Sequence, residues 1–173
     1  FAQEKTKYNR IFCKAGLLTL GKNCDTMGTT DYGAAIGGTM QIQIATMDDI
    51  EILSEHEKHI PRRELENCVR QGRVYMALDG GAFVGWLRYN LFWDLVPFMN
   101  MLYMLDGCRG KGYGHTLVAQ WESDMRAQGY DVVMTSTASD EYAQHFYNKL
   151  GYKTIGGFTL KDDPYEIILS KVL

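Results

Sequence analysis

The 173-residue chain is 46% hydrophobic and 23% charged, a composition that excludes disordered, collagen-like and low-complexity proteins. With 18 basic and 21 acidic residues its net charge is -3, which disfavours binding to nucleic-acid phosphates. A chain of this length buries roughly 70% of its extended surface, so we predict one globular domain, alone or with an appendage.

The four cysteines and four histidines show no metal-binding pattern. No two cysteines form a Cys-x-x-Cys pair, and His56-Glu57-x-His59 is one residue short of the zinc-protease motif. The chain also has no apolar stretch of ~20 residues and no signal peptide at its start. We therefore predict a cytoplasmic protein with reduced thiols, no metal and no membrane partner.

The first 39 residues differ from the rest of the chain. They hold six of the 18 glycines and show no sustained periodicity after Leu20, whereas Met40 directly precedes the first clear strand pattern. We predict that residues 1–39 are an irregular extension, a cloning remnant or part of a truncated segment, and that one domain covers 40–173. An irregular arm packed on the domain or on a neighbouring copy is the alternative.

From Met40 onward, strand and helix periodicities follow each other regularly, separated by Gly, Pro and Asp. The predicted strands cover 41–45, 74–78, 82–89, 98–105, 131–137, 152–160 and 166–171, and the predicted helices cover 48–56, 61–72, 113–128 and 140–150. Mixed elements in this order predict a single sheet with helices on its faces.

The segment Leu102 to Gly114, LYMLDGCRGKGYG, carries the clearest chemical signal. A buried strand ends there in a glycine-rich turn, and the first amides of the following helix lack internal partners, so the segment suits an anion. Arg109 and Lys111 add positive charge. A P-loop is excluded because Tyr113 follows Gly112 where the motif needs Lys, and the Gly-x-Gly-x-x-Gly spacing is absent. A purely structural turn is the alternative.

Two motifs connect the sequence to a known family. The pattern Arg-x-x-Gly-x-Gly, formed by Arg109, Gly112 and Gly114, resembles that of the GNAT superfamily of acyl-coenzyme A dependent N-acyltransferases. The segment AQHFYNKLGY, residues 143–152, is similar to the late helix of that superfamily. The aromatic stretch WLRYNLFWDLVPFMN resembles an uncharacterised bacterial subgroup, and the resemblance as a whole covers residues 40–173.

The resemblance implies an α/β (α+β) fold in which a mixed, mostly antiparallel sheet splays between its fourth and fifth strands, with helices on both faces. Acyl-coenzyme A would lie in the gap. The residues that the resemblance assigns to the coenzyme are Met104, Leu105, Arg109, Gly110, Lys111, Gly112, Tyr113, Gly114, Asp140 and Tyr147. Many relatives have Asn where this chain has Asp140, so that residue is alternatively a helix cap.

The implied activity is transfer of an acetyl group from acetyl-coenzyme A to a primary amine of a small molecule or peptide, by direct attack on the thioester. The resemblance assigns the Met104 amide to the acyl oxygen and the Tyr147 hydroxyl to protonation of the departing thiolate. A phenol with a reference pKa near 10 is protonated at neutral pH and can act as a donor. The alternative for Tyr147 is a core aromatic residue.

The general base is not fixed by the sequence. The candidates are Asp94, Asn100 through an ordered water, Glu57 and His59, and water alone is a further alternative. The residues predicted to contact the acceptor are Glu57, His59, Tyr89, Trp93, Asp94 and Asn100. Acidic groups near the predicted mouth slightly favour a cationic acceptor.

Two other functions compete with the transferase. The first is a non-catalytic acyl-coenzyme A binding or sensing module of the same fold. The second is a self-association protein, since an aromatic loop is often a homodimer contact. The acceptor and the acyl chain length lie beyond what the sequence predicts.

Overall fold

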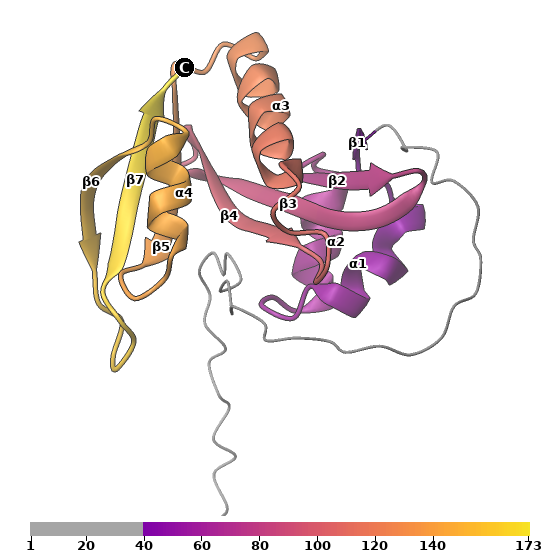
Figure 1. Cartoon of the computed structure of the whole chain (residues 1–173), viewed down its shortest axis with the longest axis horizontal. Coiled ribbons are helices and arrows are strands. Elements are labelled where there is room, and N and C mark those ends of the chain that lie inside the picture. Colours follow the sequence, from indigo (N-terminus) through magenta and orange to yellow (C-terminus); the bar gives the residue numbers. More distant parts are fainter. Residues whose placement is uncertain (1–39) are drawn as a thin grey trace, which may run out of the picture.

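The computed structural model describes residues 40–173, which form one seven-stranded sheet flanked by helices (Figure 1). The predictions made for residues 1–39 lie outside the described residues. The strands are β1 (Met40–Ile44), β2 (Val74–Asp79), β3 (Ala82–Phe92), β4 (Val96–Met104), β5 (Val132–Ala138), β6 (Lys153–Phe158) and β7 (Glu166–Val172). The helices are the 3-10 turn η1 (Met47–Asp49), α1 (Ile50–His56), α2 (Arg62–Arg70), α3 (Tyr113–Ala127) and α4 (Ala143–Lys149).

The sheet has the strand order β1-β2-β3-β4-β5-β7-β6. Only β4 and β5 run parallel, and their pairing consists of Phe98 with Met134 and Met99 with Thr135. Both strands continue past these pairs without further pairing, and Figure 1 shows the sheet opening into two halves there. The predicted mixed sheet, mostly antiparallel and splayed between its fourth and fifth strands, is confirmed.

The predicted elements are present, with differences at their ends. β3 ends three residues later and β4 begins two residues earlier than predicted, because the turn between them spans only residues 93–95. The predicted start of the late helix at Asp140 was wrong. α4 begins at Ala143, since the Glu141 N–H donates to the Ala138 carbonyl at 3.0 Å and closes a separate turn first.

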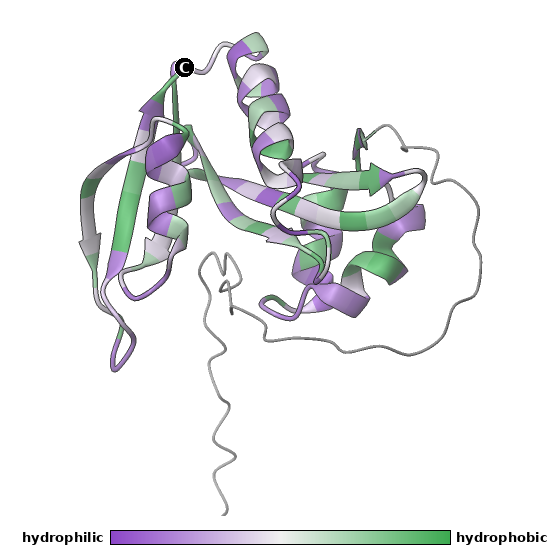
Figure 2. Ribbon diagram, in the orientation of Figure 1, coloured by the Kyte–Doolittle hydropathy of each residue, from purple (hydrophilic) through white to green (hydrophobic). Residues whose placement is uncertain are grey.

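Two apolar clusters fix the helices to opposite faces of the sheet. Leu117 and Trp121 of α3 are fully buried in the cluster that also contains Leu87 of β3. Leu53 of α1 packs in the second cluster with Trp86 of β3, the neighbour of Leu87. Adjacent strand residues thus face different helices, as the pleat requires. Figure 2 shows hydrophobic positions along the strands and inner helix faces.

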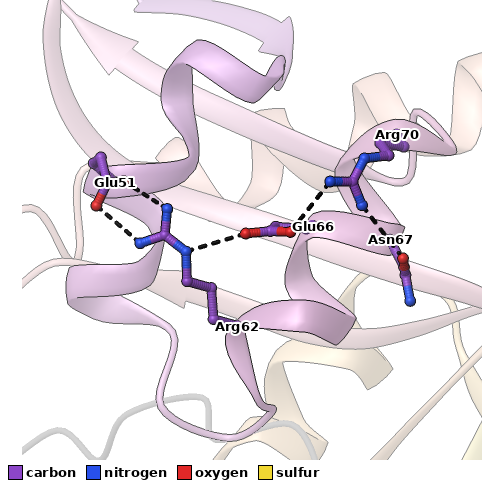
Figure 3. A network of polar contacts seen from close by, with 5 residues as sticks. All are labelled: Glu51, Arg62, Glu66, Asn67 and Arg70. Atoms are coloured by element: carbon purple, nitrogen blue, oxygen red, sulfur yellow. Dashed lines mark hydrogen bonds and ion pairs between the residues drawn. The ribbon is translucent and has the colours of Figure 1, made fainter.

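A surface network of charged side chains joins α1 to α2 (Figure 3). The Arg62 guanidinium donates to both carboxylate oxygens of Glu51, at 2.5 and 2.9 Å, and through Nε to Glu66 at 3.1 Å. Arg70 contacts Glu66 at 3.2 Å and the Asn67 side chain at 3.5 Å. Exposed pairs of this kind stabilise weakly, so the network orients the two short helices more than it stabilises the domain.

Candidate functional site

The turn between β4 and α3 is held by glycines in the left-handed region. Gly107, Gly110 and Gly112 have φ values of 80, 76 and 86°. A Cβ at any of these positions would meet nothing within 4 Å, so space beside the backbone is open and the requirement for glycine is conformational. The sequence therefore builds a turn whose backbone is accessible to a ligand.

The N-terminus of α3 follows this turn directly. Gly112 is its N-cap residue and supplies no side-chain cap, and the first internal bond runs from the Thr116 N–H to the Gly112 carbonyl at 3.1 Å. The amides of Tyr113, Gly114 and His115 therefore have no acceptor within the helix. The first turn contains no acidic residue, which keeps the positive end of the helix dipole uncompensated by a side chain. This geometry suits a phosphate group.

A cavity of about 360 Å³ opens at this helix terminus. Its walls come from β4, the glycine turn, the start of α3 and one side of α4. The lining residues are Leu102, Met104, Cys108, Arg109, Gly110, Gly112, Tyr113, Gly114, His115, Tyr142, Ala143, Phe146 and Lys149. A cavity of this size, apolar on the strand side and rich in backbone amides at the turn, suits an elongated ligand with an anionic group.

Six of the ten residues predicted to bind the coenzyme line this cavity: Met104, Arg109, Gly110, Gly112, Tyr113 and Gly114. Lys111 is exposed on the same turn but is not part of the lining. The remaining three, Leu105, Asp140 and Tyr147, lie outside the lining as well.

Arg109 is oriented by the end of β4. Its Nε donates to the Met104 carbonyl at 3.1 Å, its Nη2 lies 3.1 Å from the Asp106 carboxylate, and its guanidinium lies 5.1 Å from the centre of the Tyr103 ring. These contacts fix the positively charged Arg109 guanidinium, and Arg109 lines the cavity. The turn itself is anchored from α3, where the Tyr113 hydroxyl donates to Asp79 at the end of β2.

The free edge of β4 faces the gap in the sheet. The Leu105 N–H donates to the Val84 carbonyl at 2.9 Å, so it points toward β3 and is not available to a ligand in the gap. Alternation along an antiparallel strand turns the N–H of Met104 the other way. The backbones of Met104 and Leu105 are both predicted to pair with the pantetheine arm. The direction of the Leu105 N–H disfavours that pairing for Leu105, whereas the N–H of Met104 points to the side where the arm would lie.

Asn100 occupies a β-bulge on β4. Arg88 pairs with Met101 and Tyr89 with Met99, so Asn100 is the extra residue between them. Its Oδ1 is buried and has no hydrogen-bond partner in the described part of the chain. Next to Asn100, the last paired residues of β4 and β5 are in contact. There the Thr135 hydroxyl donates to the Met99 carbonyl at 3.0 Å. The bulge places an amide side chain next to the point where β4 and β5 separate.

Tyr147 lies on α4 and is fully buried. Its ring makes edge contacts with Phe146 at 5.3 Å and Tyr152 at 5.7 Å between centroids. Phe146, its neighbour, lines the cavity, whereas Tyr147 is not part of the lining. The role of Tyr147 as proton donor stays a prediction, and so does the role of Asp140, an exposed residue in the turn before α4.

Glu57 and His59 lie together on the α1–α2 side of the sheet. Glu57 is 4% exposed and accepts hydrogen bonds from the His59 N–H at 2.8 Å, the Arg88 Nε at 3.2 Å and the Trp86 Nε1 at 3.4 Å. The His59 Nδ1 lies 2.9 Å from the same carboxylate. Burial raises the pKa of Glu57, but the His59 hydrogen bonds and the positive charge of Arg88 outweigh it and lower the pKa to about 2. A carboxylate this acidic is a weak general base at neutral pH.

The other predicted acceptor residues are spread over β3 and its turn. Tyr89 lies in the core, 7% exposed, against Tyr75 and Trp121, and not at the surface where an acceptor could contact it. Trp93 and Asp94 form the β3–β4 turn, both with positive φ, and Trp93 is 80% exposed. The structure thus does not bring the predicted acceptor residues into one group.

Seven lining residues were not among the residues predicted to bind the coenzyme: Leu102, Cys108, His115, Tyr142, Ala143, Phe146 and Lys149. The face of α4 that meets the turn has no periodic signal of its own. Within residues 40–173, no group of three His, Cys, Asp or Glu side chains could hold a metal. None of the helices described here is long and apolar enough to cross a membrane.

Comparisons with known proteins agree with this fold. The model of the Acetyltransferase (GNAT) family matches residues 42–152. No curated protein matches the chain. Ard1 from Thermoplasma volcanium superposes with a TM-score of 0.68 at 16% identity, covering 78% of this chain and 97% of Ard1.

Two further solved structures are similar. The PaiA N-acetyltransferase from Thermoplasma acidophilum, solved in complex with coenzyme A, has a TM-score of 0.65 at 15% identity, covering 78% of this chain and 99% of PaiA. A GNAT-family acetyltransferase from Bacillus cereus has a TM-score of 0.64 at 22% identity, covering 78% and 98% of the two chains. At these identities the structural likeness establishes the fold.

Proposed function

The chain belongs to the acetyltransferase (GNAT) family, and on that premise we propose that it transfers an acetyl group from acetyl-coenzyme A to a primary amine of a small molecule or peptide. The observation that carries this proposal is the cavity at the start of α3. It combines two left-handed glycines, Gly110 and Gly112, with unpaired helix amides and with Arg109 beside the free edge of β4. These residues fit a pyrophosphate at the turn and an extended arm along the strand.

Acetyl-coenzyme A would supply an acetyl group activated as a thioester. The amides of the first turn of α3, with Arg109, would bind its phosphates and fix its orientation. The N–H of Met104, on the gap side of β4, would donate to the acyl oxygen and stabilise the negative charge that develops there. Tyr147 would give a proton to the sulfur, and direct attack then needs an amine held on the other side of the gap.

The non-catalytic acyl-coenzyme A binding module stays the second candidate. The burial of Tyr147 outside the cavity lining favours it, because a proton donor must reach the sulfur. Release of free thiol in the presence of acetyl-coenzyme A and an amine distinguishes the two functions. The transferase requires amine-dependent release, and a binding module gives none.

Replacing Gly112 by Ala is expected to weaken acetyl-coenzyme A binding roughly tenfold, about 1.4 kcal/mol. A side chain at φ 86° is strained by about 1–2 kcal/mol, and its relief shifts the amides of Tyr113 and Gly114. Calorimetric titration of both proteins with acetyl-coenzyme A measures the change.

Gly129→Ala is the matched control for this variant. Gly129 follows the other end of α3 with φ 90°, and a Cβ there also meets nothing within 4 Å. Both variants should therefore lose similar stability in urea unfolding, while only Gly112→Ala loses affinity. Equal affinity in the two variants would mean that the turn does not bind the coenzyme.

A further inference from the structure

A group of polar side chains lies outside the cavity, on the β5–β7 half of the sheet. Glu166 begins β7 and pairs with Ala138 of β5, and Ser136 lies two residues before Ala138. Residues two apart on a strand share a sheet face, so Ser136 and Glu166 lie on the same face. Leu169 lies on the opposite face and packs in one cluster with Tyr147 of α4. The pair therefore lies on the side of the sheet that α4 does not cover.

Each side chain has one buried polar atom without a partner of good hydrogen-bond geometry, and the two side chains lie close enough to interact with each other. Glu166 is 5% exposed and Ser136 is 1% exposed, and the Glu166 Oε1 and the Ser136 Oγ have no such partner in residues 40–173. Buried polar atoms in folded proteins are nearly always paired, so two adjacent exceptions point to an absent ligand that completes the pairing. A ligand for a carboxylate and a hydroxyl is a hydrogen-bond donor with positive charge.

The electrostatic surroundings favour a cation in the same place. Burial and the carboxylates of Glu141, Asp163 and Asp140 raise the pKa of Glu166, the Ser136 hydrogen bond lowers it, and the net result is a pKa of about 7. These groups come from β5, the turn before α4 and the β6–β7 connection. A bound ammonium would relieve their mutual repulsion.

The pair of Ser136 and Glu166 lies next to the gap between β4 and β5. Thr135 is the last β5 residue paired with β4, and Ser136 is the next residue. Glu141 directly precedes Tyr142 and Ala143, which line the cavity. Gly156 of β6, two strands from β5, has open space where a Cβ would be. The pair thus lies beside the end of β5 that has left β4, where an acceptor could approach a thioester held in the gap.

We propose that Glu166 and Ser136 form the acceptor subsite, in which Glu166 binds the ammonium group of a cationic amine and accepts its proton. This inference rests on the proposed acetyl transfer and names the substrate class and the base of that reaction. Neither residue belongs to the set predicted from the sequence.

The proton and electron balance is complete with the groups named. The ammonium gives one proton to the Glu166 carboxylate, which passes it to water. The free amine forms the C–N bond at the acyl carbon, and the C–S bond breaks with its electron pair on sulfur. The sulfur takes a proton from Tyr147, which regains one from the new amide nitrogen through solvent. Each turnover releases one proton.

The surrounding carboxylates also define which amine fits best. Asp140, Glu141 and Asp163 would attract a second positive charge on the acceptor. At low salt we expect 1,4-diaminobutane to have a kcat/KM at least tenfold above that of n-butylamine, and the ratio to shrink as salt screens the carboxylates. Equal values for the two amines at low salt would overturn the assignment of a polycationic acceptor.

The experiment compares wild-type protein with Glu166→Gln in a thiol-release assay with 1,4-diaminobutane. We expect kcat/KM for the amine to fall about 100-fold or more, while the KM for acetyl-coenzyme A stays within twofold. The wild-type kcat/KM should rise with pH through an apparent pKa near 7. The kcat/KM of Glu166→Gln should not show this rise. Asp162→Asn, which removes a charge from the exposed β6–β7 connection, is the matched control and should behave as wild type.

Folding of the variant is checked by its melting temperature at pH 8. A carboxyl whose pKa is raised destabilises the folded state once it ionises, so Glu166→Gln should melt at the same or a higher temperature than wild type. Unchanged kinetics and pH profile in Glu166→Gln would overturn the subsite and leave the transferase intact. Coenzyme binding by wild-type protein without turnover of any amine would overturn the proposed function, and the subsite with it.

Discussion

Tyr147→Phe is expected to lower kcat for acetyl transfer by about 100-fold or more, while the affinity for acetyl-coenzyme A stays within about twofold. The substitution removes only a hydroxyl, and the ring keeps its edge contacts with Phe146 and Tyr152 in the core. Loss of the proton donor slows departure of the thiolate without changing the turn that binds the phosphates. Steady-state kinetics and calorimetric titration of the same preparation separate the two quantities.

Two other variants make this result specific. Tyr152→Phe removes the hydroxyl of the neighbouring buried tyrosine and should keep wild-type turnover. Arg109→Glu should behave in the opposite way to Tyr147→Phe, with weaker coenzyme binding and a smaller loss of kcat at saturation. If all three variants lowered binding and turnover equally, the division of roles between the turn and α4 would be wrong.

Glu57→Gln is expected to reduce the free energy of unfolding by about 3–5 kcal/mol. Glu57 pairs with Arg88, whose side chain is 3% exposed and whose Nη2 already has no partner among the described residues. Removing the carboxylate leaves a buried guanidinium without a counter-charge. Urea unfolding followed by fluorescence measures the loss, since Trp86 and Trp121 are buried in the two core clusters.

The same ion pair predicts a dependence of stability on pH. The pKa of Glu57 falls from an ordinary 4.5 to about 2 on folding, so its contribution is present in full above pH 4.5 and is lost as the pH falls toward 2. Wild-type protein should therefore lose more stability over this interval than Glu57→Gln. The double variant Glu57→Leu, Arg88→Met, which removes both charges, should regain much of the lost stability. A double variant as unstable as the single one would show that the charges are not the cause.

The parts of the molecule that the sequence predicts best are those specified locally. The glycines at 107, 110 and 112 follow a strand and precede a helix, so their turn needs no distant partner to form. Strand and helix positions follow from periodicity in the same way. The opening of the sheet between β4 and β5 was predicted only from the resemblance of two short motifs to a known family, because periodicity does not indicate which strands pair.

The parts that could not be predicted depend on distant segments. Glu57 is an ordinary surface residue by its sequence context, and its burial follows only from contact with Arg88, 31 positions away. Glu166 acquires its raised pKa from burial and from residues of the turn before α4 and of the β6–β7 connection. The bulge at Asn100 depends on the register between β3 and β4. Each of these features requires tertiary structure, and each bears on the acceptor side, where sequence reasoning was least successful.

Calorimetric titration of the purified protein with acetyl-coenzyme A directly tests whether the cavity at the start of α3 binds the coenzyme. We expect saturable binding at one site per chain, weakened by Gly112→Ala and unaffected by Gly129→Ala. Absence of binding, or binding that both variants weaken equally, would contradict the assignment of the cavity at the start of α3 to the coenzyme.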